Sequence, residues 1–133
     1  MKFLLTIYGD EARWTEASPE DAQQTMAAYG ALSEAMQEAG VLLGGEGLQT
    51  SSTATTVQVR GGDTITTDGP FVETREQLGG YYLLDCKDLD EAIGWAARIP
   101  DATHGTVEVR PVMDYEAMGA EEAPTQTEGS SQS

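Results

Sequence analysis

Hydrophobic positions along this chain follow two different periods, and the changes between them mark strands and helices. Residues 2–8 (KFLLTIY) are rich in strand-forming side chains and apolar on both faces, so the predicted strand needs cover on both sides. Residues 18–40 carry apolar side chains three or four positions apart, which predicts a long amphipathic helix. Ser18 as the N-cap, Pro19 in the first turn and Gly40 as the stop agree with these ends. The apolar stripe consists of Ala22, Met26, Tyr29, Leu32, Met36 and Ala39.

The rest of the chain predicts a hairpin and a second strand-helix-strand unit. The expected elements are an irregular strand (41–48), a hairpin (53–68), a strand apolar on both faces (77–86), a helix (88–100) and a last strand (106–112). The hairpin turns at Gly61-Gly62, and Asp88 caps the second helix with Glu91 three residues later.

This order predicts an α+β fold, a ferredoxin-like split βαβ sandwich with an inserted β-hairpin. Two helices cover only one face of such a sheet, and the central strands are apolar on the other face as well. We therefore expect a homodimer, in which the second face meets the sheet of an identical subunit. The alternative is that the C-terminal segment covers this face. The predicted domain spans residues 1–113, and residues 114–133 are expected to form an acidic, Ser/Thr-rich, flexible tail, too polar for that cover.

The charge and the cysteine content limit which partners and which cellular compartment we expect. The chain has 7 Lys+Arg against 23 Asp+Glu, a formal net charge of −16, so its field repels phosphate backbones and anionic lipids. We expect no direct nucleic-acid partner and no membrane association. Cys86 is the single cysteine and cannot form an internal disulfide, and the apolar run at the start is too short for a signal peptide. These features predict a cytoplasmic protein.

The sequence contains none of the common motifs for binding a metal or a cofactor. It contains no Gly-x-Ser-x-Gly elbow, no phosphate-binding glycine loop and no Cys-x-x-Cys pair. We therefore expect no cofactor and no metal site.

His104 is the first catalytic candidate, because histidine is the side chain that ordinarily titrates near neutral pH. It leads into the last strand, which is expected to run antiparallel to the first, so it should approach Tyr8, Asp10 or Glu11. We expect the two central strands to be parallel, which would bring Asp85 to the same end. A histidine among carboxylates can act as an acid. The alternative is an ordinary solvated loop histidine.

The segment that begins Asp68-Gly69-Pro70 is the second candidate. Its chemistry is that of a turn, and the charged residues that follow it are not explained by a turn alone. Because it precedes a central strand, we expect Asp68 at the opposite end from His104, so these two are separate catalytic candidates and not a dyad within one subunit. Candidates for contacting a substrate are Tyr8, Glu73, Arg75 and Tyr81. The alternative is a purely structural loop.

Five blocks together resemble the YCII-related family in its DGPF subgroup, over residues 1–113; they are KFLLTIYGDE, GGEGL, TDGPFVETREQLGGYYLLD, DLDEAIGWAARIP and GTVEVRPV. The resemblance implies a dimeric α+β barrel of two ferredoxin-like sheets, and it implies no general reaction for this subgroup. Better-understood YCII-like proteins resemble muconolactone isomerases and a dehydrochlorinase, with a proposed His-Asp dyad around the first helix. Tyr29 and Glu38 fall at those positions here, so the histidine is absent. A tyrosine, with a pKa of about 10, is a poor general base, and Tyr29 also fits the apolar helix stripe.

Two classes of function remain open from the sequence. The first is a small cofactor-free enzyme, of the isomerase or lyase type, that acts on a small ring-containing metabolite in a cavity between sheet and helices. The second is a ligand-binding or partner-binding accessory protein, because DGPF relatives often occur beside or fused to sigma-type transcription factors. A pocket with convergent polar groups favours the first class, and a filled core with an exposed face favours the second.

Overall fold

The computed structural model describes residues 1–119 of the chain. The predicted tail begins at residue 114, and its residues 120–133 lie outside the described part of the chain. The elements in chain order are β1 (Lys2–Gly9), α1 (Glu11–Thr15), α2 (Pro19–Glu38), β2 (Leu42–Gly47), the 3₁₀ turn η1 (Ser51–Thr53), β3 (Thr55–Arg60), β4 (Asp63–Asp68), β5 (Gln77–Asp85), α3 (Leu89–Ala96), the 3₁₀ turn η2 (Pro100–Thr103) and β6 (Thr106–Pro111). None of the described helices is both long and apolar enough to cross a bilayer.

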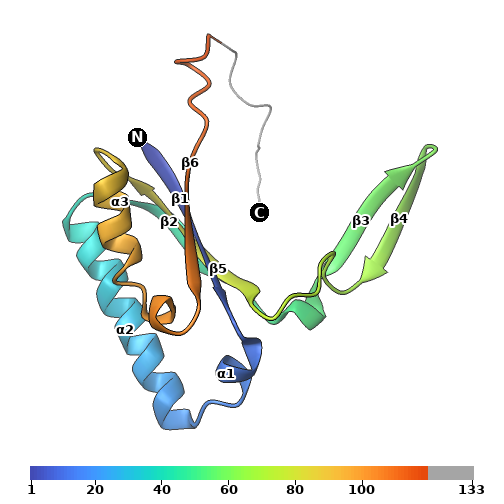
Figure 1. The fold of residues 1–133 in the computed structure, drawn as a ribbon, viewed down its shortest axis with the longest axis horizontal. Coiled ribbons are helices and arrows are strands. Elements are labelled where there is room, and N and C mark those ends of the chain that lie inside the picture. Colours follow the sequence, from blue (N-terminus) through green and yellow to red (C-terminus); the bar gives the residue numbers. More distant parts are fainter. Residues whose placement is uncertain (120–133) are drawn as a thin grey trace.

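The main sheet has four strands in the order β2-β5-β1-β6, and β3 pairs only with β4 in a separate two-stranded sheet. Helices α2 and α3 pack on one face of the main sheet (Figure 1). This arrangement confirms the predicted ferredoxin-like α+β fold with an inserted hairpin. The last strand is antiparallel to the first, as expected, since Tyr8 pairs with Thr106.

The expectation of parallel central strands is wrong. β1 and β5 are antiparallel, with Lys2 opposite Asp85 and Gly9 opposite Gln77. The physical reason is the chain path: β2 returns parallel to β1 after α2, and the hairpin insertion then reverses the chain before β5. Asp85 consequently lies at the start of β1, where the N-terminal ammonium of Met1 contacts its carboxylate at 3.1 Å. It is therefore at the opposite end of the sheet from β6's first residue and His104.

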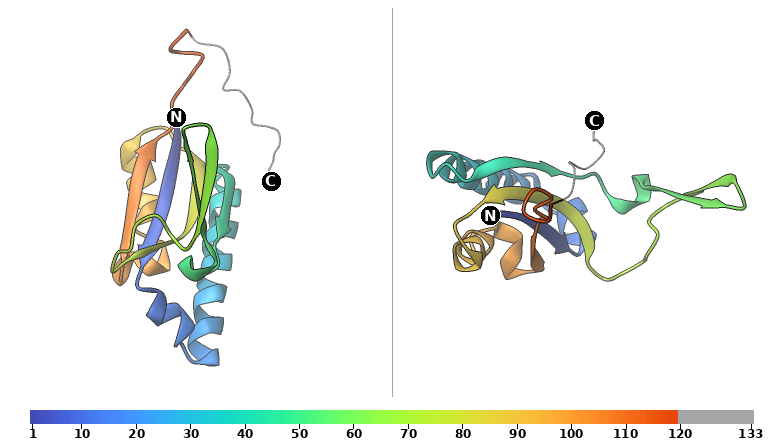
Figure 2. Two further views of the ribbon diagram at one scale, coloured as in Figure 1. Left: turned by 90° about the vertical axis from the view of Figure 1, so that its right-hand side faces the viewer. Right: turned by 90° about the horizontal axis from the view of Figure 1, so that it is seen from above.

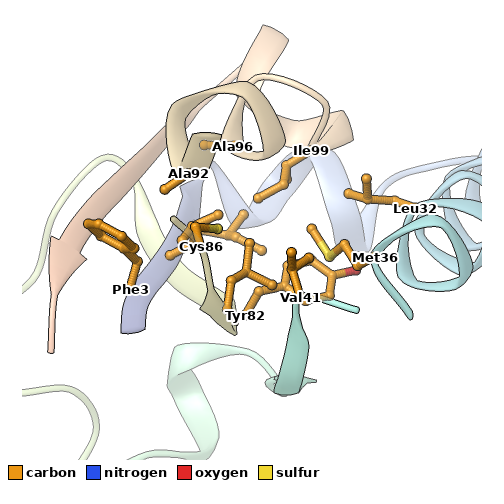
Figure 3. Packing of buried hydrophobic residues seen from close by; sticks show 12 residues of the cluster. Phe3, Leu32, Met36, Val41, Tyr82, Cys86, Ala92, Ala96 and Ile99 are labelled. Carbon is orange, nitrogen blue, oxygen red and sulfur yellow. The ribbon is translucent and has the colours of Figure 1, made fainter. Parts of the chain in front are cut away.

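The hydrophobic core lies between the sheet and the two helices, and its side chains converge from the sheet and from both helices (Figure 3). Alternate residues of β1 and β5 point into it, which follows from the pleat of a strand. The buried members are Phe3, Leu5, Ile7, Leu32, Met36, Val41, Tyr82, Leu84, Cys86, Ala92, Ala96 and Ile99. Cys86 is thus a small buried side chain, as expected, and burial, with the nearby carboxylates of Glu91 and Asp85, raises the pKa of its thiol.

Both predicted helix caps are confirmed. The Ser18 hydroxyl accepts from Asp21 N–H at 3.1 Å, and the Asp88 carboxylate accepts from Glu91 N–H at 2.9 Å. Glu91 in turn accepts from Lys87 N–H at 2.7 Å, which closes a capping box one position earlier than the usual one.

Only about half of the apolar stripe of α2 packs into the core. Leu32 and Met36 are buried and Tyr29 is half-buried, but Met26 is 75% exposed. The reason is the length of the helix: its first half extends past the end of the sheet (Figure 1). The amphipathic helix is thus present, but its apolar stripe meets the core only from Tyr29 onward.

The β3–β4 hairpin stands away from the domain. It projects from the side of the sheet that the helices leave open, as the view from above shows (Figure 2). Val57 and Val59 are each 59% exposed on it. The open face of the main sheet itself carries the alternate residues Leu4, Tyr8 and Leu83.

The uneven burial of α2 generates a prediction that uses two methionines of the same helix. Met36→Ala should lower the free energy of unfolding by about 2–5 kcal/mol, because Met36 is fully buried and its removal leaves a cavity. Met26→Ala should change it by less than about 0.5 kcal/mol. Urea denaturation of both variants measures this difference, and equal losses would show that the first half of α2 is covered after all.

Candidate functional site

A cavity of about 610 Å³ opens at the end of the sheet where β1 finishes and β6 begins. Its walls come from α1, the first two turns of α2 and η2, which lie at the same end of the molecule (Figure 1). Trp14, Asp101 and His104 are among the side chains that line it. The half of α2 that extends past the core is therefore a wall of this cavity.

Helix α1 was not predicted from the sequence. It spans only five residues, which is too short for a hydrophobic period to be visible. The available signal was Asp10, whose carboxylate caps the helix by accepting from Ala12 N–H at 2.9 Å. None of its residues is fully buried, so α1 is held in place by specific contacts and not by a core of its own.

Trp14 makes the contact that fixes α1 to the sheet. Its indole ring lies against the backbone at Gly9 and Gly79, where an added Cβ would collide with the ring. These two glycines therefore leave the space that the tryptophan fills. The indole Nε1–H donates to the Asp101 carboxylate at 3.0 Å, which joins α1 to η2.

Asp101 is the centre of the site. One carboxylate oxygen accepts from Trp14 and the other accepts a short hydrogen bond from the Tyr29 hydroxyl on α2. The turn η2 holds the residue in place, since the Asp101 carbonyl accepts from His104 N–H at 3.2 Å and Gly105 N–H at 2.7 Å. A carboxylate has about four acceptor positions, so two remain for another donor.

Tyr29 serves as a hydrogen-bond donor in this arrangement. Burial raises its pKa well above the ordinary value for tyrosine, and the hydrogen bond and negative charge of Asp101 raise it further. The hydroxyl therefore keeps its proton at neutral pH and cannot act as a general base. Its ring packs against the core, as the stripe predicted.

The two positions that the family resemblance assigned to a dyad do not meet. Tyr29 and Glu38 are nine residues apart on α2, or about 13 Å along the axis. The acidic partner of Tyr29 is Asp101, which comes from a distant part of the chain.

His104 ends η2 and lines the cavity together with Asp10. Its neighbour Gly105 lies tightly against the Tyr8 carbonyl, so the histidine is beside the end of β1. The imidazole is exposed, in keeping with its place on an open cavity wall.

The remaining candidates lie elsewhere. Tyr8 and Tyr81 are on the open face of the sheet by alternation with the buried Ile7 and Tyr82.

Asp68 ends β4, and Glu73 and Arg75 lie in the exposed loop that follows. That loop enters the sheet at Gln77, opposite Gly9, so it joins the sheet at the end where His104 lies. The expectation that the segment starts at the opposite end is wrong, because it assumed parallel central strands. Asp68 is nevertheless not among the residues that line the cavity with His104, because it pairs with Thr55 at the base of the hairpin.

The turn chemistry of the Asp68-Gly69-Pro70 segment is present in the structure. Gly69 has a φ of 103°, a left-handed value that favours glycine. Its N–H donates to the Ala54 carbonyl at 2.7 Å, and its carbonyl accepts from the Thr56 hydroxyl at 2.8 Å. These bonds close the base of the hairpin.

Carboxylates dominate the cavity wall. Asp10, Glu16, Asp21 and Asp101 line it, against the single guanidinium of Arg13. Within residues 1–119, no group of three or more His, Cys, Asp or Glu side chains is arranged to hold a metal ion.

The fold and the cavity define a small α+β protein with an acidic pocket at one end of a ferredoxin-like sheet. Residues 1–116 match the YCII-related domain. The chain is also similar to an uncharacterised protein of Rhizobium meliloti (strain 1021), at 38% identity over 117 residues, which cover 86% of this chain and 94% of that protein. The chain belongs to the YCII-related family.

The raised pKa of Tyr29 predicts a loss of stability at alkaline pH. The folded protein keeps a proton that the unfolded chain releases above about pH 10, so stability falls as pH rises through that value. Between about pH 9 and pH 11, the wild type should lose more free energy of unfolding than Tyr29→Phe does. Tyr115→Phe, which removes a more exposed tyrosine, is the control and should follow the wild type. Parallel curves for wild type and Tyr29→Phe would contradict the buried hydrogen bond.

Proposed function

We propose that this protein is a small cofactor-free enzyme, of the isomerase or lyase type, that acts on a ring-containing metabolite in the cavity between α1, α2 and η2. The observation that carries the proposal is the Asp101 carboxylate, held in one orientation by donors from two other elements at the wall of this cavity. Functional carboxylates need such fixed geometry, because misplacement of the reacting group is costly in rate.

The site offers the groups that proton transfer requires. Asp101 has free acceptor positions and can take a proton from a bound substrate, and His104 on the same wall can return one. Tyr29 keeps its proton and holds the carboxylate in place, so it is a positioning residue. Trp14 supplies apolar surface beside these polar groups, which is the usual composition of a small-molecule site.

The charge of the wall selects among ring compounds. Four carboxylates face one guanidinium around the cavity, so an anionic aromatic acid would meet net repulsion. A neutral or cationic ring compound, such as a lactone or a cyclic amine, fits this wall better.

We further place the chain in the DGPF subgroup, on the Asp68-Gly69-Pro70-Phe71 segment at the base of its hairpin. We also propose a homodimer in which the open faces of two sheets meet. The support is the apolar character of Leu4, Tyr81 and Leu83 on a face that no described element covers.

The open face also favours a second function, that of an accessory protein that binds a macromolecular partner linked to sigma-type regulation. Under that function the cavity would be incidental, and binding would depend on the open face and the hairpin. The two functions therefore differ in which surface a substitution must alter.

The test compares two aspartate-to-asparagine variants. Asp101→Asn should abolish both the thermal stabilisation by small lactones and cyclic amines and their conversion, measured by mass spectrometry of the reaction mixture. Asp90→Asn, an exposed aspartate on α3, should behave as the wild type. Urea melts without ligand separate a folding defect from a binding defect. Equal ligand responses in wild type and Asp101→Asn would contradict the proposed site.

A further inference from the structure

We propose that the β3–β4 hairpin is an arm that packs against a second copy of this chain. This inference rests on the homodimer proposed above and goes beyond it, because it assigns a contact to an element outside the two main sheets.

The base of the arm is fixed. Ser51, just before the hairpin, donates its N–H and its hydroxyl to the Glu11 carboxylate at 2.6 and 2.8 Å. The Gly69 N–H donates to the Ala54 carbonyl and the Thr56 hydroxyl donates to the Gly69 carbonyl. The Ser51 bonds therefore tie the start of the hairpin to α1, and the Gly69 bonds close its two strands at the base.

The arm has no cover of its own. An isolated two-stranded hairpin is at best marginally stable in water, and a third strand or a packed face is needed to stabilise it. Val57 and Val59 point to one face of the hairpin by alternation, and each is 59% exposed. Phe71, directly after it, is 76% exposed. A preset ribbon of this length with exposed apolar side chains is typical of an element that is completed by a partner.

The direction of the arm identifies that partner as a second copy. The hairpin stands on the open side of the main sheet, in front of the face with Leu4 and Leu83 (Figure 2). One molecule thus presents an uncovered apolar face and an uncovered apolar ribbon on the same side. In a two-fold dimer each surface appears twice, so a single association buries both faces and both arms. A different protein would have to match both surfaces separately.

Charge supports the same choice. A chain of net charge −16 repels its own copies unless the contact avoids the acids. Lys2 and Arg110 alternate onto the open face, Arg60 lies at the hairpin tip and Arg75 follows the hairpin. These are four of the seven lysine and arginine residues of the chain. Acids accompany them, since Arg110 bonds to Glu108 on the same face and Arg60 pairs with Asp63 across the hairpin tip, so these basic residues offset part of the negative charge of the open side.

The decisive variant replaces residues 55–68 by Asn-Gly. Because Gly69 N–H already bonds to the Ala54 carbonyl, two residues between them complete an ordinary β-turn, and the main sheet keeps its strands. Sedimentation should show a wild-type dimer and an armless chain whose association is weaker by at least about tenfold, with unchanged helix content by circular dichroism. An armless dimer as strong as the wild type would overturn the arm while leaving the dimer in place. A monomeric wild type would overturn both.

A second experiment does not depend on deleting the hairpin. A photoreactive phenylalanine derivative replaces Val59 in isotopically heavy chain, which is mixed with light chain and irradiated. Products that join heavy to light chains are expected, and products confined to single chains would overturn the proposal. Val57→Thr with Val59→Thr should weaken the dimer while keeping strand propensity, whereas the control Gln58→Thr, on the other face of β3, should leave it unchanged. If both substitutions weaken it equally, the assigned face is wrong and the proposal fails.

Discussion

The site depends on one carboxylate that accepts hydrogen bonds from two directions. Asp101 joins Trp14 of α1 to Tyr29 of α2, across sequence separations of 87 and 72 residues. Helix α1 buries none of its residues fully, and the first half of α2 lies past the edge of the sheet. The core reaches neither α1 nor the first half of α2, so the junction at Asp101 is what ties these two walls of the cavity to each other. The glycines beside Trp14 have the same purpose, because they leave room for the indole to reach Asp101.

The cavity and the open face of the sheet are two separate surfaces of the molecule. The cavity lies at one end, between the helices and η2, while the open face and the hairpin lie on the opposite side of the sheet (Figure 1). Glu11 links the two, since it belongs to α1 and accepts both hydrogen bonds from Ser51 at the base of the hairpin. The element that forms a wall of the cavity is thus also the one that anchors the arm.

The sequence predicted the parts of this structure that repeat locally. The strands β1 and β5, the caps at Ser18 and Asp88 and the order of the elements all follow from short-range patterns, and the structure has them. It did not predict α1, because five residues show no period. It also missed the antiparallel central pair, which depends on how many times the chain reverses between β1 and β5.

The candidate site was predicted only in part, because sequence patterns show local features and do not show contacts between residues that are distant along the chain. His104 stood out by its chemistry and lies on the cavity. Asp101, three residues earlier, did not stand out, because an aspartate in a loop is ordinary until its partners are known, and those partners are far away in sequence. Met26 and Tyr29 shared one stripe in the sequence, but only the structure shows where the sheet ends along α2.

The most direct measurement of the central claim is an NMR titration that follows the two tryptophan indoles. Trp14 lines the cavity and donates to Asp101, whereas Trp95 lies under the Arg98 guanidinium, is not among the residues that line the cavity and serves as the internal reference. Small lactones or cyclic amines should shift the indole N–H signal of Trp14 together with the amides of η2, and leave Trp95 unmoved. Shifts confined to the open face of the sheet, or none at either indole, would contradict a ligand site organised by Asp101.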